Sequence, residues 1–229
     1  MLAGIRGVLF DKDGTLFDFS ESWSGWAAGL LEDLSAGDEG RASAMAAAIG
    51  FDRAAGRFEP TSPVIAGTLD EAAMCLGGHL PELSHAELTR YLLESAVRAE
   101  MVAPVQLGPF LRELRLRQFA LGVATNDAEA AARAHLTRAG VLAEFTAVLG
   151  YDSGFTPKPA PDMLLEFAAR AGLAPAQVVM VGDSTHDLIA GRAAGMVTVG
   201  VLTGMAPAEV LSPHADLVLP HIGHLTEHL

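Results

Sequence analysis

The chain is short of cysteine, of basic residues and of long apolar runs, and each shortage excludes a class of protein. Cys75 is the only cysteine among 229 residues, so no disulfide can form within the chain. Lys and Arg number 15 against 28 Asp and Glu, a formal net charge of −13 that repels nucleic acids and anionic lipids. No apolar stretch approaches the roughly 18 residues that indicate a membrane span. We therefore expect neither a nucleic acid nor a membrane as partner.

The start of the chain also lacks the features of a secretory signal peptide. The first ten residues have no small-residue cleavage site and no basic beginning. Half of all residues are apolar, which is enough to bury a substantial core. These features predict a globular cytoplasmic protein and leave a monomer and a homodimer equally open.

Short apolar runs alternate with helix-favouring segments over the second half of the chain. This rhythm predicts an α/β fold with a doubly wound parallel sheet, a Rossmann-like core. The expected strands are Ile5 to Phe10, Phe119 to Ala124, Phe145 to Leu149, Val178 to Val181, Val197 to Val201 and Leu217 to Leu219. The expected helices are Pro109 to Arg117, Ala128 to Ala139, Pro161 to Ala171 and His186 to Ala194.

The connection after the first strand is far longer than a parallel sheet requires. A βαβ crossover needs about a dozen residues or more, whereas this connection continues as far as Pro109 and is Ala-rich over 21–50 and helix-favouring again over 87–100. The excess predicts an inserted α-helical cap domain. We expect residues 1–17 and 104–229 to form the core and residues 18–103 to form the cap.

Two carboxylates follow the first strand. Asp11 and Asp13 are two positions apart, so in extended backbone they project to one side, beyond the strand end where ligands bind in open α/β sheets. Their repulsion would raise one pKa unless a cation binds. The pair therefore either ligates a divalent metal, or divides into nucleophile and proton donor, or does both. A polar turn is the alternative, whereas a calcium loop fails on spacing because Leu16 stands where such a loop needs glycine.

A second acidic pair follows the strand at 178–181. Asp183 and Asp187 are four residues apart at the start of a helix, and carboxylates from two strand ends suit Mg²⁺. Helix capping by Asp183 or Ser184, with Asp187 complementing the helix dipole, is the alternative. Capping and metal binding are compatible.

Two further positions offer groups for an anion. Thr125 and Asn126 lie between a strand and a helix, where backbone N–H groups are unpaired, although Asn126 and Glu129 also fit a capping box. Lys158 lies in the stiff segment TPKPAP and is either an exposed loop residue or a cation held for a ligand.

The ordered set DKDGT, Thr125 with Asn126, Lys158 and GDSTHD resembles the four motifs of the haloacid dehalogenase superfamily of phosphotransferases. The position of the helical insertion resembles the cap of its phosphoglycolate phosphatase-like branch. The resemblance implies a phosphatase that acts on a small phosphate monoester with Mg²⁺ as cofactor.

The resemblance also implies residue roles. Asp11 would attack phosphorus to form an aspartyl-phosphate, and Asp13 would protonate the leaving alcohol and later activate water. Asp11, the backbone carbonyl of Asp13 and Asp183 would ligate Mg²⁺, with Asp187 acting through a water or orienting Lys158. Thr125, Asn126 and Lys158 would hold the phosphoryl oxygens.

The cap is expected to choose the substrate, and Arg57, with Arg53 as a second candidate, is placed to bind an anionic group when the cap closes. Trp23 and Trp26 are expected to pack the cap helix. The Lys12 side chain is expected to point away from the site. A phosphomutase and a non-catalytic phosphometabolite-binding protein remain alternatives, whereas a phosphoaspartate receiver domain would not need so long an insertion.

Overall fold

The core of the computed structural model, which describes residue 2 and residues 4–229, is a sheet of six parallel strands. Their spatial order is β5-β4-β1-β6-β7-β8. The strands are β1 (Gly7–Phe10), β4 (Ala120–Ala124), β5 (Ala147–Leu149), β6 (Val178–Gly182), β7 (Val197–Val201) and β8 (Leu217–Leu219). Because β1 pairs with β4 on one side and β6 on the other, the three strands that precede the motifs are neighbours.

Helices cover both faces of this sheet. Alternate residues of β1 face opposite layers: Val8 and Phe10 pack with α5 (Leu107–Leu116) and α6 (Glu129–Arg138), whereas Leu9 packs with α7 (Asp162–Ala171) and α8 (Thr185–Ala194). Burial on both faces explains why the strands are almost wholly apolar. A short helix α9 (Ala208–Leu211) and 3₁₀ turns at Leu142–Glu144, Pro175–Gln177 and Ile222–Glu227 complete the core.

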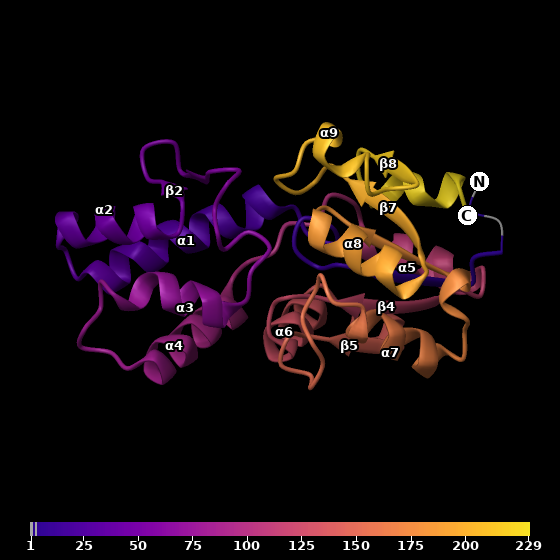
Figure 1. Ribbon diagram of the computed structural model, residues 1–229, viewed down its shortest axis with the longest axis horizontal. Helices are drawn as coiled ribbons and strands as arrows, with labels where there is room; N and C mark the ends of the chain where they lie inside the picture. Colours follow the sequence, from indigo (N-terminus) through magenta and orange to yellow (C-terminus); the bar gives the residue numbers. More distant parts are fainter. Residues whose placement is uncertain (1, 3) are drawn as a thin grey trace.

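The insertion after β1 is a separate helical layer, drawn in indigo and magenta at the left of Figure 1. It comprises α1 (Phe19–Ser35), α2 (Glu39–Ala48), a hairpin of β2 (Phe51–Asp52) and β3 (Arg57–Phe58), α3 (Leu69–Gly77) and α4 (His85–Arg98). The Ala-rich stretch divides into two helices because Ala36 and Gly37 take left-handed φ values of 50° and 85°, after which Asp38 caps α2. The cap has its own apolar core, and α4 packs against α6.

The two segments that join cap and core run side by side. The backbone N–H of Asp18, which also caps α1, donates to the carbonyl of Val102 at 2.8 Å. We propose that the domain boundary lies where these two segments meet, between residues 17 and 18 and between residues 103 and 104. The placement follows from the first residue of α1 and from the extended return after α4.

The predicted α/β fold with an inserted helical cap is confirmed, and the core strands agree with the expected ranges to within a few residues. Gly172 and Gly195 end α7 and α8 in the left-handed conformation. Helix α3 and the hairpin were not anticipated. A signal for α3 was present, since Thr68 and Glu71 form a capping box ahead of an apolar stripe. Within the described residues, no helix is both long and apolar enough to cross a bilayer.

Candidate active site

The site lies where the carboxyl ends of β1, β4 and β6 meet. Asp11 follows β1, Thr125 follows β4, Asp183 follows β6, and Lys158 comes from the loop between β5 and α7. All four line one cavity between core and cap. The neighbouring places of the three strands in the sheet therefore bring together motifs that are far apart in the chain.

Two glycines let the backbone close around the Asp183 carboxylate. Gly14 has φ of 79°, and a Cβ at either Gly14 or Gly204 would collide with the carboxylate of Asp183. The turn after Asp13 therefore needs glycine both for its left-handed conformation and for this close approach.

Lys158 joins two of the buried carboxylates. Its Nζ lies 2.6 Å from Asp11 Oδ1 and 2.6 Å from Asp187 Oδ1, and its side chain is 3% exposed. Burial lowers the pKa of Lys158, but Asp11 and Asp187 more than offset this, so the net shift of its pKa is upward. The alternative of an exposed loop lysine is excluded by its burial.

Asp11, Asp183 and Asp187 fit a divalent cation. Each offers one carboxylate oxygen, and these atoms lie within 4.8 Å of one another. Burial is the main cause that raises the pKa of Asp11 to about 7, a shift that Lys158 reduces, and burial likewise raises the pKa of Asp183 well above its ordinary value. One ammonium does not balance three buried carboxylates, and hard oxygen donors of this kind suit Mg²⁺.

Asp187 has two roles at once. Its Oδ2 accepts from the backbone N–H and the hydroxyl of Ser184, at 3.0 and 2.7 Å, in a capping box at the start of α8. Its Oδ1 accepts from Lys158. The two interpretations of this motif, helix cap and site residue, therefore hold together.

Asn126 holds the lysine loop in place. Its Oδ1 accepts from the backbone N–H of Lys158 at 3.0 Å, and its Nδ2 donates to the carbonyls of Lys158 and Ala66 at 2.9 and 3.0 Å. Ala66 belongs to the cap, so this amide also contacts the inserted layer. The alternative capping box with Glu129 does not form, because α6 begins after Ala128.

The Thr125 hydroxyl is buried at the end of β4. It accepts a hydrogen bond from the backbone N–H of Asp127 at 3.0 Å. Its own hydrogen therefore remains to be donated toward the cavity that Thr125 lines.

The expectation for Lys12 is wrong. Its fully buried Nζ lies 2.6 Å from Asp13 Oδ1, 3.0 Å from Asp127 Oδ2 and 3.1 Å from His135 Nδ1. The side chain folds onto the Asp13 carboxylate, and among the described residues no other cation pairs with Asp13 or Asp127. Burial lowers the pKa of Lys12, and Asp13 and Asp127 more than offset it, so its pKa is raised overall.

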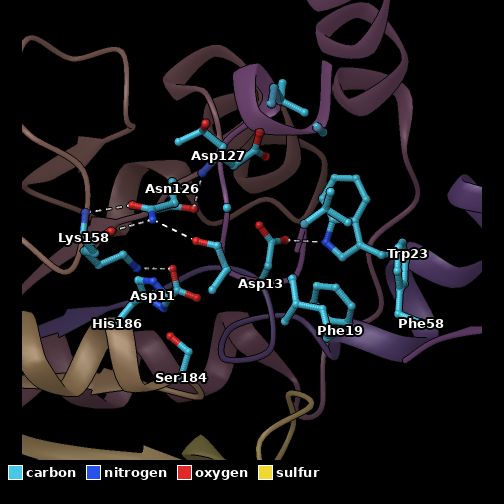
Figure 2. Close-up of a pocket in the computed structure, with 18 of the residues that line it drawn as sticks. Asp11, Asp13, Phe19, Trp23, Phe58, Asn126, Asp127, Lys158, Ser184 and His186 are labelled. Carbon is cyan, nitrogen blue, oxygen red and sulfur yellow. Dashed lines mark hydrogen bonds and ion pairs between the residues drawn. The ribbon is translucent and has the colours of Figure 1, made fainter. Parts of the chain in front are cut away.

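Trp23 from the cap also binds Asp13. Its indole Nε1 donates to Asp13 Oδ1 at 2.8 Å, as Figure 2 shows, while its ring packs edge-on against Trp26 with centroids 5.0 Å apart. The predicted packing role is confirmed but incomplete. Two donors thus turn the Asp13 carboxylate away from the carboxylates of Asp11, Asp183 and Asp187, so the side chain of Asp13 is not part of that metal-binding group.

His135 on α6 completes this network and was missed in the sequence. Lys12 donates to its Nδ1, so the ring hydrogen is on Nε2, which donates to the carbonyl of Ala96 in the cap at 2.8 Å. Burial, with a smaller contribution from Lys12, lowers the pKa of His135 to about 4. No short motif marks this residue, because its partners come from β1 and α4.

The structure does not bring the two candidate arginines to the site. Arg57 is exposed on β3 and does not line the cavity. Arg53 pairs with Glu39 at 3.0 Å on the outside of the cap. The cavity wall from the cap is instead apolar.

Comparison with known proteins agrees with this geometry. The model of the haloacid dehalogenase-like hydrolases matches residues 5–195. The chain belongs to this family. "Probable phosphatase IndB" of Dickeya dadantii is 34% identical over 89% of this chain and 84% of its own length. The phosphoglycolate phosphatase of Escherichia coli K12 is 30% identical over 95% of this chain and 88% of its own.

Solved structures of the family share the fold. The crystal structure of a predicted phosphoglycolate phosphatase from Haemophilus somnus aligns with 100% of this chain over 99% of its own length, with a TM-score of 0.74 and 19% identity. The same fold, including the cap, is therefore present in another haloacid dehalogenase-like protein at low identity.

The first prediction concerns Lys12. In this hydrolase, Lys12→Met removes the cation between two carboxylates and is expected to destabilise the fold by about 3–5 kcal/mol, the usual cost of breaking a buried ion pair. Urea unfolding measures the loss, and the double variant Lys12→Met/Asp127→Asn should recover part of it. A single variant within about 0.5 kcal/mol of wild type would show that the pair is not important for stability.

The second prediction concerns pH. The unfolded chain protonates His135 near the ordinary value of 6.5 and the folded protein only near 4, so the unfolded state binds more protons between these values and stability falls as pH is lowered. His135→Gln keeps one hydrogen-bond acceptor and one donor but cannot be protonated. Between pH 7 and pH 5 its free energy of unfolding should therefore fall by about 2 kcal/mol less than that of wild type, as measured by urea unfolding at each pH. His79→Gln is the control. Equal pH dependence in wild type and His135→Gln would contradict a neutral buried imidazole.

The third prediction concerns the carboxylates. Because the pKa of Asp11 is raised to about 7, the metal-free folded state binds more protons than the unfolded state between about 4 and 7, and this group lowers stability as pH rises through that window. Mg²⁺ at about a hundred times Kd should stabilise the protein by about 2.7 kcal/mol, and more at pH 8 than at pH 5.5. Thermal unfolding should show no Mg²⁺ effect in Asp183→Asn and a full effect in the surface control Asp33→Asn. A full effect in Asp183→Asn would place the ion elsewhere.

Proposed function

We propose that the protein is a Mg²⁺-dependent phosphatase that hydrolyses a small phosphorylated metabolite, a phosphate monoester, through an aspartyl-phosphate on Asp11. The observation that carries the proposal is the division of two neighbouring carboxylates between two buried lysines. Asp11 pairs with Lys158 beside Asp183 and Asp187, and Asp13 pairs with Lys12 beside Trp23. Two relatives that are 34% and 30% identical to this chain are named as phosphatases, which supports the reaction class.

Asp11 is suited to the nucleophile. Lys158 binds its Oδ1, which orients the carboxylate and leaves Oδ2 for attack on phosphorus. As the Oδ2–P bond forms, the bond from phosphorus to the ester oxygen breaks and its electron pair stays with the leaving oxygen. The Lys158 ammonium then stabilises the negative charge on the transferring phosphoryl group.

Asp13 is suited to the acid and base. Lys12 and Trp23 hold its Oδ1, so Oδ2 is free to give its proton to the leaving oxygen. In the second half of the reaction, Asp13 takes a proton from water, and the oxygen of that water attacks phosphorus. The bond between phosphorus and Asp11 then breaks and inorganic phosphate leaves.

The remaining residues bind and orient. The Thr125 hydroxyl donates to a phosphoryl oxygen, and Asn126 fixes the Lys158 loop through three hydrogen bonds, two to Lys158 and one to Ala66. Asp11 and Asp183, with Asp187 alongside, would hold Mg²⁺, which would supply positive charge against the negative charge of the phosphoryl group. Asp187 binds the same Lys158 ammonium that Asp11 binds and so helps to fix its position.

The fourth prediction separates the two carboxylate roles. Asp11→Asn should abolish phosphate release, because the amide is a poor nucleophile. Asp13→Asn should slow hydrolysis of an alkyl phosphate by about two to four orders of magnitude and that of p-nitrophenyl phosphate by less, because a good leaving group needs no acid. Inorganic phosphate release gives the rates, and one phosphate per substrate consumed separates a phosphatase from a mutase.

Two results would count against these assignments. Wild-type phosphate release by Asp11→Asn would exclude it as the nucleophile. Equal losses on both substrates in Asp13→Asn would indicate a structural role for that carboxylate. Asp33→Asn, an exposed carboxylate on α1, serves as the control and should release phosphate at the wild-type rate.

A further inference from the structure

The cavity beside Asp13 has one polar wall and one apolar wall. The core supplies the polar wall with the carboxylates and Lys158. The cap supplies the other wall, which includes Phe19, Trp23, Trp26, Ile49, Phe58 and Leu76. Figure 2 shows Lys158 reaching Asp11 on one side, while Trp23, Phe19 and Phe58 gather on the far side of Asp13.

The few polar groups on the cap wall already have partners. The Thr68 hydroxyl donates to Glu71 Oε2 at 3.1 Å, and Trp26 Nε1 donates to Ser95 Oγ at 2.9 Å. Trp23 Nε1 is bound to Asp13. No described arginine or lysine of the cap lines this cavity, so the wall offers no ready charge or hydrogen bond to a leaving group.

The wider cleft that leads outward from this cavity also lacks an arginine or lysine among the described cap residues that line it. It has a volume of about 1090 Å³, and the charged groups that the cap contributes to it are the carboxylates of Asp70 and Glu71. Lys158 is the single lysine or arginine among the described residues that line either space, and the phosphoryl group needs it. A carboxylate on the leaving group would lose its hydration without gaining a lysine or arginine partner from the described cap residues and would face acidic side chains on the way in.

Asp13 sets the direction of the leaving group. The acid must lie within hydrogen-bond reach of the leaving oxygen, and Trp23 contacts this same carboxylate at 2.8 Å. The carbon attached to the leaving oxygen therefore points toward the aromatic wall. Phe19 and Phe58 pack edge-on within that wall, with ring centroids 5.6 Å apart.

We propose, building on the proposed phosphatase function, that the substrate is the phosphate ester of an uncharged, mainly apolar alcohol with an aromatic or branched aliphatic group. A carboxylate-bearing alcohol such as glycolate, or a polyhydroxyl sugar, lacks partners on this wall. The aromatic side chains bury an apolar leaving group and so bind both the ester and the transition state.

The experiment compares three primary alkyl phosphates under saturating Mg²⁺: benzyl phosphate, 2-phosphoglycolate and glucose 6-phosphate. All three release a primary alcohol, so kcat/KM reports chiefly how the cavity receives the organic group. We expect benzyl phosphate to exceed each of the others at least tenfold. Equal or higher kcat/KM for 2-phosphoglycolate or glucose 6-phosphate would overturn the substrate class and leave the phosphatase function standing. Phosphate release from none of a wider panel would overturn the phosphatase function itself.

Variants of the wall make the test specific. Phe58→Ala should lower the preference for benzyl phosphate about tenfold, whereas Leu88→Ala, a buried cap residue that does not line the cavity, should lower stability and leave the preference unchanged. Ile65→Arg adds a cation at a half-buried position of the wall and should raise kcat/KM for 2-phosphoglycolate about tenfold. The same preference in Phe58→Ala as in Leu88→Ala would show that this wall does not select the substrate.

Discussion

The pairing of buried Lys158 with Asp11 and Asp187 is the interaction on which the rest of the site depends. One ammonium holds the carboxylate that follows β1 and the carboxylate that begins α8, at 2.6 Å each. Without it, three carboxylates would share a volume that burial has removed from water. The Asn126 side chain binds the backbone N–H and carbonyl of Lys158, and the prolines stiffen the same loop. Both restrain the Lys158 backbone, which lets its ammonium bind two fixed acceptors at once.

A second buried lysine gives Asp13 a different environment from Asp11. Two carboxylates so close in the chain would otherwise compete for one cation and one proton. Lys12 leaves the strand on the opposite side from its neighbours, yet its long side chain returns to Asp13 Oδ1. One carboxylate thus belongs to the cluster whose oxygens fit a divalent cation and the other does not. Pairs of acids placed in different environments are how one site provides both a nucleophile and an acid.

The cap takes part in this division because it supplies one hydrogen-bond donor and two acceptors to residues of the core. Trp23 donates to Asp13, the Ala66 carbonyl accepts from Asn126, and the Ala96 carbonyl accepts from His135. Trp23 contacts Asp13 directly, Ala66 contacts the residue that holds the Lys158 backbone, and Ala96 contacts His135, which reaches Asp13 through Lys12. The closed arrangement of cap and core and the orientation of the catalytic side chains are therefore coupled.

The sequence by itself determined the parallel core and the place of the insertion and singled out Asp11, Asp13 and Asp183, because apolar strands followed by acidic turns are local patterns. The local pattern left Lys158 either an exposed loop residue or a cation held for a ligand, and the family resemblance favoured the second. The tertiary structure decided that it is buried between Asp11 and Asp187. Only the tertiary structure decided what Lys12, Trp23 and His135 do. Their partners lie on other elements, and no spacing within one segment records such a contact. The predicted role of Arg57 depended on the direction of a cap hairpin, which is set by packing between helices. Local patterns reveal where a site lies, whereas long-range packing decides which side chains reach it.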